Sequence, residues 1–334
     1  MWCCLVGSEM CIRDRSIPVG LEPIALALKP DQSELWVSNH VSDSVNVIDL
    51  DPSSPTFHQV VGLIDASSYQ EADRYFDEPA GIAFASNAKA YVALSQENQI
   101  AVIDTARLEI TKTIAVPAQD PRAIAVFEDK LFVLPFESNN QTQLSGCLPS
   151  KIDGERCTFD AIEHVFTNNN VLSLNYVADI IKNPELPDRD LLVYDTSSEQ
   201  LIDTVEGLGT LLYGLTVTDS GQVVIAQTDA RNDANGLAGS AGHGLAELEN
   251  RPFLNQLSVV LCGTNDPCDT QASRIQLESP PPDQLSDGSA LATPYSVVAI
   301  PDTSWIAGTA AGSDEVFIVD ASQQTLLSRH SVGA

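Results

Sequence analysis

The feature that most constrains this chain is a unit of short apolar segments that recurs in the same internal order. One unit runs from Pro23 to Asp49, a second from Pro79 to Asp104, and a third from Pro294 to Asp320. In each unit a proline opens one apolar segment, and an aspartate closes a later segment of alternating polarity, 25 or 26 residues downstream. Short strands at such a spacing are typical of β-propellers, in which each repeat forms one blade. The sequence therefore predicts an all-β fold of four-stranded antiparallel blades.

About five blades can be traced between Ser16 and Ala334, and two of them are interrupted. The third runs from Pro121 to Asp195, so it contains an insertion over about residues 135–189. The fourth lacks the leading proline and contains an insertion over about residues 228–254. Both insertions follow a second strand, so we expect them to emerge on one face and form a cap or a pocket wall.

The repeat also carries a recognisable signature in its second strand. Leu35-Trp36-Val37-Ser38-Asn39 stands where the YVTN family of β-propellers has its namesake motif, and Ala90-Tyr91-Val92-Ala93 is a second copy. The chain therefore resembles YVTN repeat proteins, which are similar to WD-repeat propellers and to the β-chain of quinoprotein amine dehydrogenase. The resemblance implies the fold. It leaves function open, because such propellers serve as surface proteins, binding scaffolds and partners of redox domains.

The two ends of the chain depart from this pattern. Met1 to Arg15 lies outside the repeat, and Val6 to Arg15 resembles a translated sequencing adapter, so we interpret residues 1–15 as a non-native scar. A signal peptide is a poorer interpretation, because the apolar stretch is short and Glu9 interrupts it. Leu327 to Ala334 repeats the phase of Ser16 to Leu21. We therefore expect a fragment of a larger ring, of about seven blades, with a freestanding five-bladed ring as the alternative.

The charge of the chain restricts its partners. The formal net charge at pH 7 is −29. Such an acidic surface repels nucleic acid and anionic lipid, so neither is an expected partner. It could attract cations, or it could serve only as a solvated surface. No apolar run of about 18 residues exists, so we expect no insertion into a membrane.

Four cysteines lie outside the N-terminal scar. Cys147 and Cys157 form one local pair, and Cys262 and Cys268 form another. Two short-range disulfides are the expected state in an oxidising compartment. Zinc is the alternative, but no histidine sits at ligand spacing. We therefore predict a periplasmic or extracellular protein whose signal peptide is missing.

The second insertion holds the densest group of polar side chains. Its candidate ligand-binding residues are Asp229, Arg231, Asn232, Asp233, Asn235, His243 and Glu247. Asp229, Asp233 and Asn235 offer hard oxygens that suit calcium, although the spacing is not that of an EF-hand. The alternative is a loop in which these groups bind turn amides. His243 lies between glycines and could be a metal or haem ligand, a general base, or a structural residue.

Four aspartates end third strands: Asp49, Asp104, Asp195 and Asp320. Because every good blade shares this aspartate, we expect it to cap the following turn and have no catalytic role. The outer strand of the first blade is expected over Thr56 to Val61. The chain contains no nucleophile elbow, no covalent haem motif, no P-loop and no dinucleotide fingerprint.

Together these observations favour a non-catalytic module that binds a protein, a glycan or a small molecule. One alternative is the propeller part of a redox protein, in which a c-type cytochrome or peroxidase domain of the same full-length chain would hold haem. Another is a metal-dependent hydrolase or lactonase with its metal in the central channel, which is disfavoured because the repeats supply few inward carboxylates. No cofactor is certain, and calcium is the one that the candidate loop suits.

Overall fold

The computed structural model describes most of the chain outside the N-terminal segment and the two insertions. The described residues are 16–70, 74–138, 144–147, 177–180, 188–230, 251, 253–263, 267–269, 271–279 and 288–333. Within them the regular structure is almost entirely β-strand, and a short 3₁₀ helix at Ala66–Ser68 lies between the first two blades.

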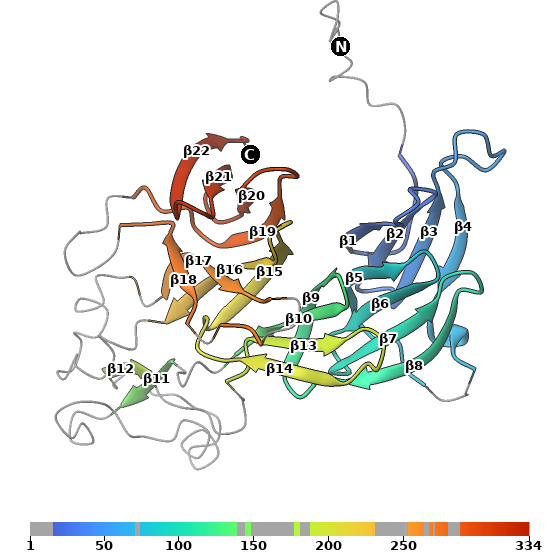
Figure 1. The fold of residues 1–334 in the computed structure, drawn as a ribbon, viewed down its shortest axis with the longest axis horizontal. Helices are drawn as coiled ribbons and strands as arrows, with labels where there is room; N and C mark the ends of the chain where they lie inside the picture. The colour runs from blue at the N-terminus through green and yellow to red at the C-terminus, as the bar shows by residue number, and fades with distance from the viewer. Residues whose placement is uncertain are drawn as a thin grey trace, which may run out of the picture.

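Five blades of four antiparallel strands follow one another along the described chain, as the repeat predicts (Figure 1). The strands of blades 1 and 2 are β1 (Pro23–Leu28), β2 (Glu34–Asn39), β3 (Ser44–Asp49), β4 (Val60–Ile64), β5 (Pro79–Ser86), β6 (Lys89–Leu94), β7 (Gln99–Asp104) and β8 (Glu109–Ala115). Those of blade 3 are β9 (Gln119–Phe127), β10 (Lys130–Glu137), β13 (Leu191–Asp195) and β14 (Leu201–Val205). Those of blades 4 and 5 are β15 (Leu211–Val217), β16 (Gln222–Ala230), β17 (Phe253–Leu261), β18 (Ser273–Gln276), β19 (Pro294–Ala299), β20 (Trp305–Ala310), β21 (Glu315–Asp320) and β22 (Thr325–Ser331).

The blades form an open arc around a common centre. The first strand of each blade lies innermost, and the fourth lies at the outer edge (Figure 1). Blades 3 and 4 are joined into one sheet by a single pairing between Glu137 and Leu211. A set of four-stranded sheets packed face to face around a channel is a β-propeller, so the fold class predicted from the repeat is confirmed.

The hydrophobic core lies between blades and is divided into four clusters. Each cluster joins two blades that are consecutive in the chain. Between blades 1 and 2, for example, Trp36 and Val47 pack with Ile82 and Val92. Alternation along each strand produces this arrangement, since successive side chains point to opposite faces of a blade and both faces of an inner blade are covered.

The aspartates that end third strands cap the turns that follow them, as predicted. The N–H of Asp51 donates to Asp49 Oδ1 (2.9 Å), that of Ala106 to Asp104 Oδ1 (3.0 Å) and that of Ser322 to Asp320 Oδ1 (2.9 Å). Ser198 makes the same bond to Asp195. Hydroxyl and amide donors of these turns hold the pKa values of three of the carboxyls below their usual range, namely those of Asp49, Asp195 and Asp320.

The expected outer strand of blade 1 was wrong by several residues. β4 spans Val60–Ile64, and the segment before it forms turns. Thr56 bends back so that its hydroxyl donates to Asp49 Oδ2 (2.6 Å), which removes it from the sheet.

The turns between strands use the left-handed backbone region repeatedly. Fourteen non-glycine residues have positive φ angles between 48° and 62°. They are Glu22, Gln32, Asp43, His58, Glu78, Asn98, Leu108, Asp120, Glu128, Glu199, Thr293, Asp302, Asp314 and Gln324. Four of them, Glu22, Glu78, Asp120 and Thr293, directly precede the proline that opens a blade.

The two insertions begin slightly later than expected. β10 continues to Glu137, and β16 continues to Ala230 because Thr228 and Asp229 still pair with β17. Within the first insertion, β11 (Leu144–Cys147) and β12 (Val177–Ile180) form a two-stranded antiparallel sheet. In the part of the chain that the structure describes, no helix is long and apolar enough to cross a membrane.

Candidate functional site

The innermost strands share a backbone irregularity near their start. In every blade, the register between the first and second strand shifts within the first four residues of the first strand. The residues at these bulges are Ile24, Ala80 with Gly81, Arg122, Tyr213 and Tyr295. A β-bulge re-aims the side chain that it carries. Each blade thereby contributes one position to the centre of the arc.

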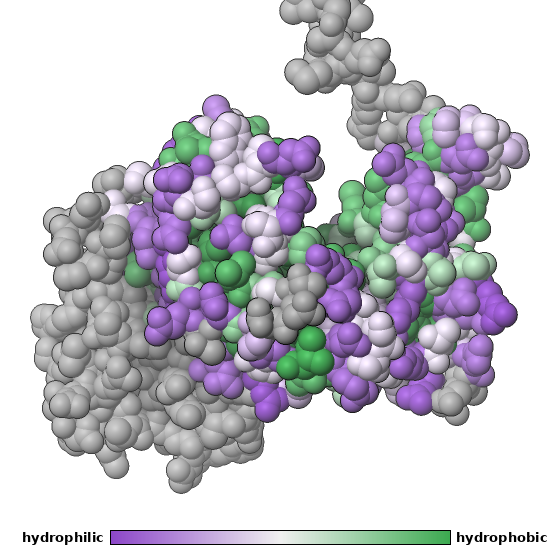
Figure 2. All heavy atoms as spheres, viewed as in Figure 1, coloured by the Kyte–Doolittle hydropathy of each residue, from purple (hydrophilic) through white to green (hydrophobic). Residues whose placement is uncertain are grey.

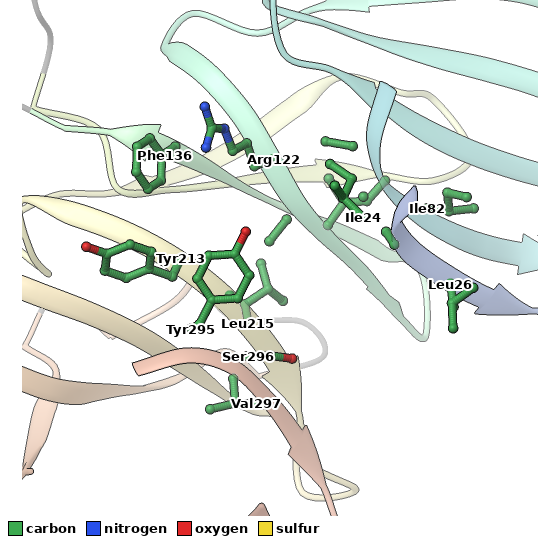
Figure 3. Close-up of a pocket in the computed structure, with 16 residues that line it drawn as sticks. Ile24, Leu26, Ile82, Arg122, Phe136, Tyr213, Leu215, Tyr295, Ser296 and Val297 are labelled. Atoms are coloured by element: carbon green, nitrogen blue, oxygen red, sulfur yellow. The ribbon is translucent and has the colours of Figure 1, made fainter. Parts of the chain in front are cut away.

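These positions line a cavity of about 460 Å³ at the centre of the propeller (Figure 3). Ile24 and Leu26 come from blade 1, Ile82 from blade 2, Arg122 from blade 3 and Tyr213 from blade 4. Because its walls come from the inner strands of all five blades, the cavity is the central channel of the propeller. Its volume falls within the usual range for small-molecule sites, roughly 300–1,000 Å³.

An array of aromatic rings covers one wall of the channel. The Phe136 and Tyr213 ring centroids lie 5.5 Å apart in an edge-to-face arrangement. Tyr213 and Tyr295 follow, with centroids 5.9 Å apart and planes inclined by 42°. Figure 3 shows the three rings side by side, contributed by β10, β15 and β19. The Tyr295 side chain is 51% exposed, so this end of the array faces solvent.

Arg122 closes the other end of the aromatic array. Its guanidinium carbon lies 4.2 Å from the centroid of the Phe136 ring. The same guanidinium binds Asp120 through two nitrogens, with Nε donating to Oδ1 at 2.9 Å and Nη2 lying 2.7 Å from Oδ2. A two-point bond of this kind fixes the plane of the guanidinium and balances its charge. Arg122 therefore acts as a rigid, flat extension of the aromatic wall.

Two glycines allow the inner strands to approach each other closely. A Cβ atom at Gly81 would lie 2.6 Å from the carbonyl oxygen of Arg122, and one at Gly214 would lie 2.7 Å from that of Tyr295. Neither approach is compatible with a side chain. Gly81 and Gly214 therefore permit the spacing between the inner strands, and with it the width of the channel.

The channel wall is suited to binding by surface complementarity. Ile24, Leu26, Ile82, Leu215 and Val297 provide apolar surface opposite and below the aromatic rings. Among the described residues that line the cavity, the only charged side chain is that of Arg122, and none is a carboxylate, a histidine or a thiol. Polar selectivity would come from the two tyrosine hydroxyls and from backbone groups at the bulges.

Most of the residues predicted to bind a ligand lie outside the described residues. These are Arg231, Asn232, Asp233, Asn235, His243 and Glu247. Asp229 is described, and its Oδ2 lies 3.0 Å from Nη1 of Arg274. Arg274 also donates to the carbonyl oxygens of Gly207 and Leu208, so Asp229 belongs to a network that ties blade 4 to the strand connection before it. Among the residues described, no group of three or more His, Cys, Asp or Glu is placed to hold a metal.

One of the two predicted disulfides is present. Cys262 and Cys268, which follow β17 in the chain, are bonded to each other, and both are buried against the core between blades 3 and 4. The other pair cannot be compared, because Cys157 lies outside the described ranges.

Sequence reasoning missed the channel residues. The signal that could have located them is positional, since Ile24, Arg122 and Tyr295 each directly follow the proline that opens a blade. Tyr213 occupies the same place in blade 4, where Leu212 replaces the proline. An aromatic or cationic residue at that repeat position points to the channel.

Comparisons with known proteins add no family. No protein-family model matches the chain, and no curated protein matches it. Among solved structures, it is similar to Kuenenia stuttgartiensis hydrazine synthase, with 14% identity, a TM-score of 0.49, and coverage of 96% of this chain and 90% of that one. It is also similar to a chain of a nidogen/laminin complex (12% identity, TM-score 0.48, 92% and 80% covered). A third likeness is to the β-propeller domain of Myceliophteria thermophila Cps50 (Swd1) (10% identity, TM-score 0.48, 96% and 89% covered). By the arrangement of its own blades, the chain is a β-propeller module.

Proposed function

We propose that this β-propeller is a non-catalytic binding module whose ligand enters the aromatic end of the central channel. The observation that carries the proposal is the array formed by Arg122, Phe136, Tyr213 and Tyr295 along one wall of a 460 Å³ cavity. Ligand sites are concave and mostly apolar, with a few polar groups that fix orientation. The channel has these properties, and the tyrosine hydroxyls supply the polar groups.

The shape of the wall favours a ligand with a flat apolar face and hydroxyl groups at its edge. A sugar ring of a glycan has this form, because its axial C–H groups stack on aromatic rings while its hydroxyls reach hydrogen-bond partners. Arg122 is already paired with Asp120, so a strongly anionic ligand would have to compete with that carboxylate. We therefore favour a neutral glycan over an anionic small molecule.

The proposed compartment is the periplasm or the cell exterior. The bond between Cys262 and Cys268 supports this assignment, because structural disulfides persist in oxidising environments. The acidic net charge of −29 suits a protein that must stay dissolved in a saline medium.

The test is a binding screen of neutral oligosaccharides against the whole chain, followed by calorimetry on each ligand found. We expect Tyr295→Ala to weaken binding roughly two- to twelvefold, since one aromatic stacking contact contributes on the order of 0.5–1.5 kcal/mol. Tyr75→Ala is the matched control, because Tyr75 is exposed and does not line the channel. Equal affinity in the wild type and in the Tyr295→Ala protein would exclude the channel as the site.

A further inference from the structure

The aromatic wall of the channel offers three flat surfaces in a row. Arg122 lies over Phe136, with its guanidinium carbon 4.2 Å from the ring centroid, so these two side chains of blade 3 form one surface. Tyr213 of blade 4, which is half-buried, provides the second surface, and Tyr295 of blade 5, which is 51% exposed, provides the third. We call these three surfaces platforms. Because each comes from a different blade, they follow one another around the channel (Figure 3).

The spacing of the platforms matches the length of one residue in a glycan chain. The ring centroids of Phe136 and Tyr213 lie 5.5 Å apart, and those of Tyr213 and Tyr295 lie 5.9 Å apart. In a linear glycan, successive sugar rings are joined through a single glycosidic oxygen, and their centres are separated by a similar length. A chain can therefore place one sugar ring on each platform.

The volume of the channel agrees with three rings. A cavity of roughly 150 Å³ holds one six-membered ring, as benzene binding shows. The channel measures about 460 Å³, so it has room for about three such rings, and a single sugar would leave two platforms uncovered. Sugar hydroxyls need further space and water. The side of the channel at blade 1 supplies both, since Leu26 is 68% exposed and Figure 2 shows the surface hollowed between blades 1 and 5.

The tilt of the platforms restricts the shape of the chain. The planes of Phe136 and Tyr213 are inclined by 68°, and those of Tyr213 and Tyr295 by 42°. A flat ribbon, in which all sugar rings lie near one plane, stacks on only one of these platforms at a time. A chain in which each ring is turned relative to the one before can follow all three. The wall therefore favours a curved glycan over a flat one.

We propose that the channel binds a curved, neutral glycan chain with one sugar residue on each of the three platforms. This inference rests on the proposed function and adds the length and the shape of the ligand. Arg122, held by Asp120, stands at one end of the row, and the exposed Tyr295 stands at the other. Longer chains leave the channel past Tyr295. A fourth sugar finds no further aromatic ring among the described residues that line the channel.

The test is calorimetry of the whole chain with glucose oligomers of one to five residues. Two series, α-1,4-linked and β-1,3-linked, are curved, and a β-1,4-linked series is the flat control of the same composition. In at least one curved series, each added sugar should raise affinity roughly two- to twelvefold up to the third residue, because each gains one stacking contact. The fourth and fifth sugars, and each sugar added to the flat series, should raise it less than twofold. No gain with length in either curved series would overturn the proposal, as would a larger gain in the flat series.

Tyr295→Ala tests the assignment of one sugar to each platform. The variant keeps two platforms, so its affinity should stop rising at the second residue, whereas the Tyr75→Ala control should still gain from the third. A Tyr295→Ala protein that still gains from the third sugar would overturn the assignment.

Failure of this inference can be told apart from failure of the proposed function. A ligand from the screen that binds more weakly to Tyr295→Ala, but whose affinity does not depend on chain length, would overturn the inference and leave the channel as the binding site. Equal affinity of Tyr295→Ala and wild type for every ligand would refute the proposed function and this inference together.

Discussion

Asp190 makes the stability of this propeller depend on pH near neutrality. It is fully buried immediately before β13, where its carboxylate accepts the N–H of Leu208 from the connection to blade 4. Burial raises the pKa of this carboxyl from 3.8 to about 7. The folded protein therefore holds the proton at pH values where the unfolded chain has already lost it.

The sign and size of the effect follow from proton linkage. Between pH 3.8 and 7 the folded state binds one more proton than the unfolded state, so stability falls as the pH rises through this window. The whole difference corresponds to about 4 kcal/mol, of which roughly 2–3 kcal/mol falls between pH 5 and pH 8. Asp190→Asn resembles the neutral acid at every pH. We expect the variant to match the wild type near pH 5 and to exceed it by about 2 kcal/mol at pH 8.

The assay is urea unfolding of both proteins at pH 5, 6, 7 and 8. Asp195→Asn is the control, because hydrogen bonds from Ser198 hold the pKa of the exposed Asp195 below its usual range. That carboxyl is ionised in both states above pH 5, so its removal should shift stability by the same amount at every pH tested. A difference between Asp190→Asn and wild type that does not vary from pH 5 to pH 8 would refute the reasoning.

Three further predictions follow from packing and pairing. Trp36→Ala should lower the free energy of unfolding in denaturant by about 3–5 kcal/mol, since the side chain is fully buried between blades 1 and 2. Trp305 is 44% exposed, so Trp305→Ala should lower it by less than about 1 kcal/mol. Equal losses in the two variants would contradict the assignment of the core. Replacing both Cys262 and Cys268 with serine should lower stability by about 2 kcal/mol, the loop-closure value for so short a loop, and reduction of the wild type should reproduce the loss of Tm. Glu199→Gln should lower the free energy of unfolding by roughly 1–3 kcal/mol, because the buried Glu199 carboxylate binds Lys89 (2.7 Å) and Lys112 of the neighbouring blade. A thermal unfolding curve that the substitution leaves unchanged would show that this bridge does not stabilise the interface.

The sequence predicted the blades well because the signals of a blade are local. A proline before the first strand and an aspartate after the third mark strand ends through backbone chemistry that acts within a few residues. The outer strand of blade 1 was misplaced because neither of these local signals marks where it begins. The Thr56 hydroxyl binds Asp49 and keeps its segment out of the sheet, and nothing in the sequence around Thr56 shows this.

The channel could not be predicted in the same way. Its wall joins Ile24 and Tyr295, which are far apart in sequence, and each is an ordinary residue within its own repeat. Only the arrangement of the five blades around a common centre brings the bulged positions together. The sequence instead favoured polar residues between Asp229 and Glu247 that are close together in the chain, and all of them except Asp229 lie outside the described residues.

The left-handed turn residues also bear on how the protein folds. Nine of the fourteen, Glu22, Gln32, His58, Glu78, Leu108, Glu128, Glu199, Thr293 and Gln324, are neither asparagine nor aspartate, the non-glycine residues that best tolerate this conformation. Six of the nine, all except Glu22, Glu78 and Thr293, lie in turns within a blade, and each costs on the order of 1 kcal/mol, so the hairpins of a single blade are weakly favoured in isolation. The transition state for folding should therefore contain contacts between at least two blades, with many of the turns adopting their final angles only after the sheets have packed.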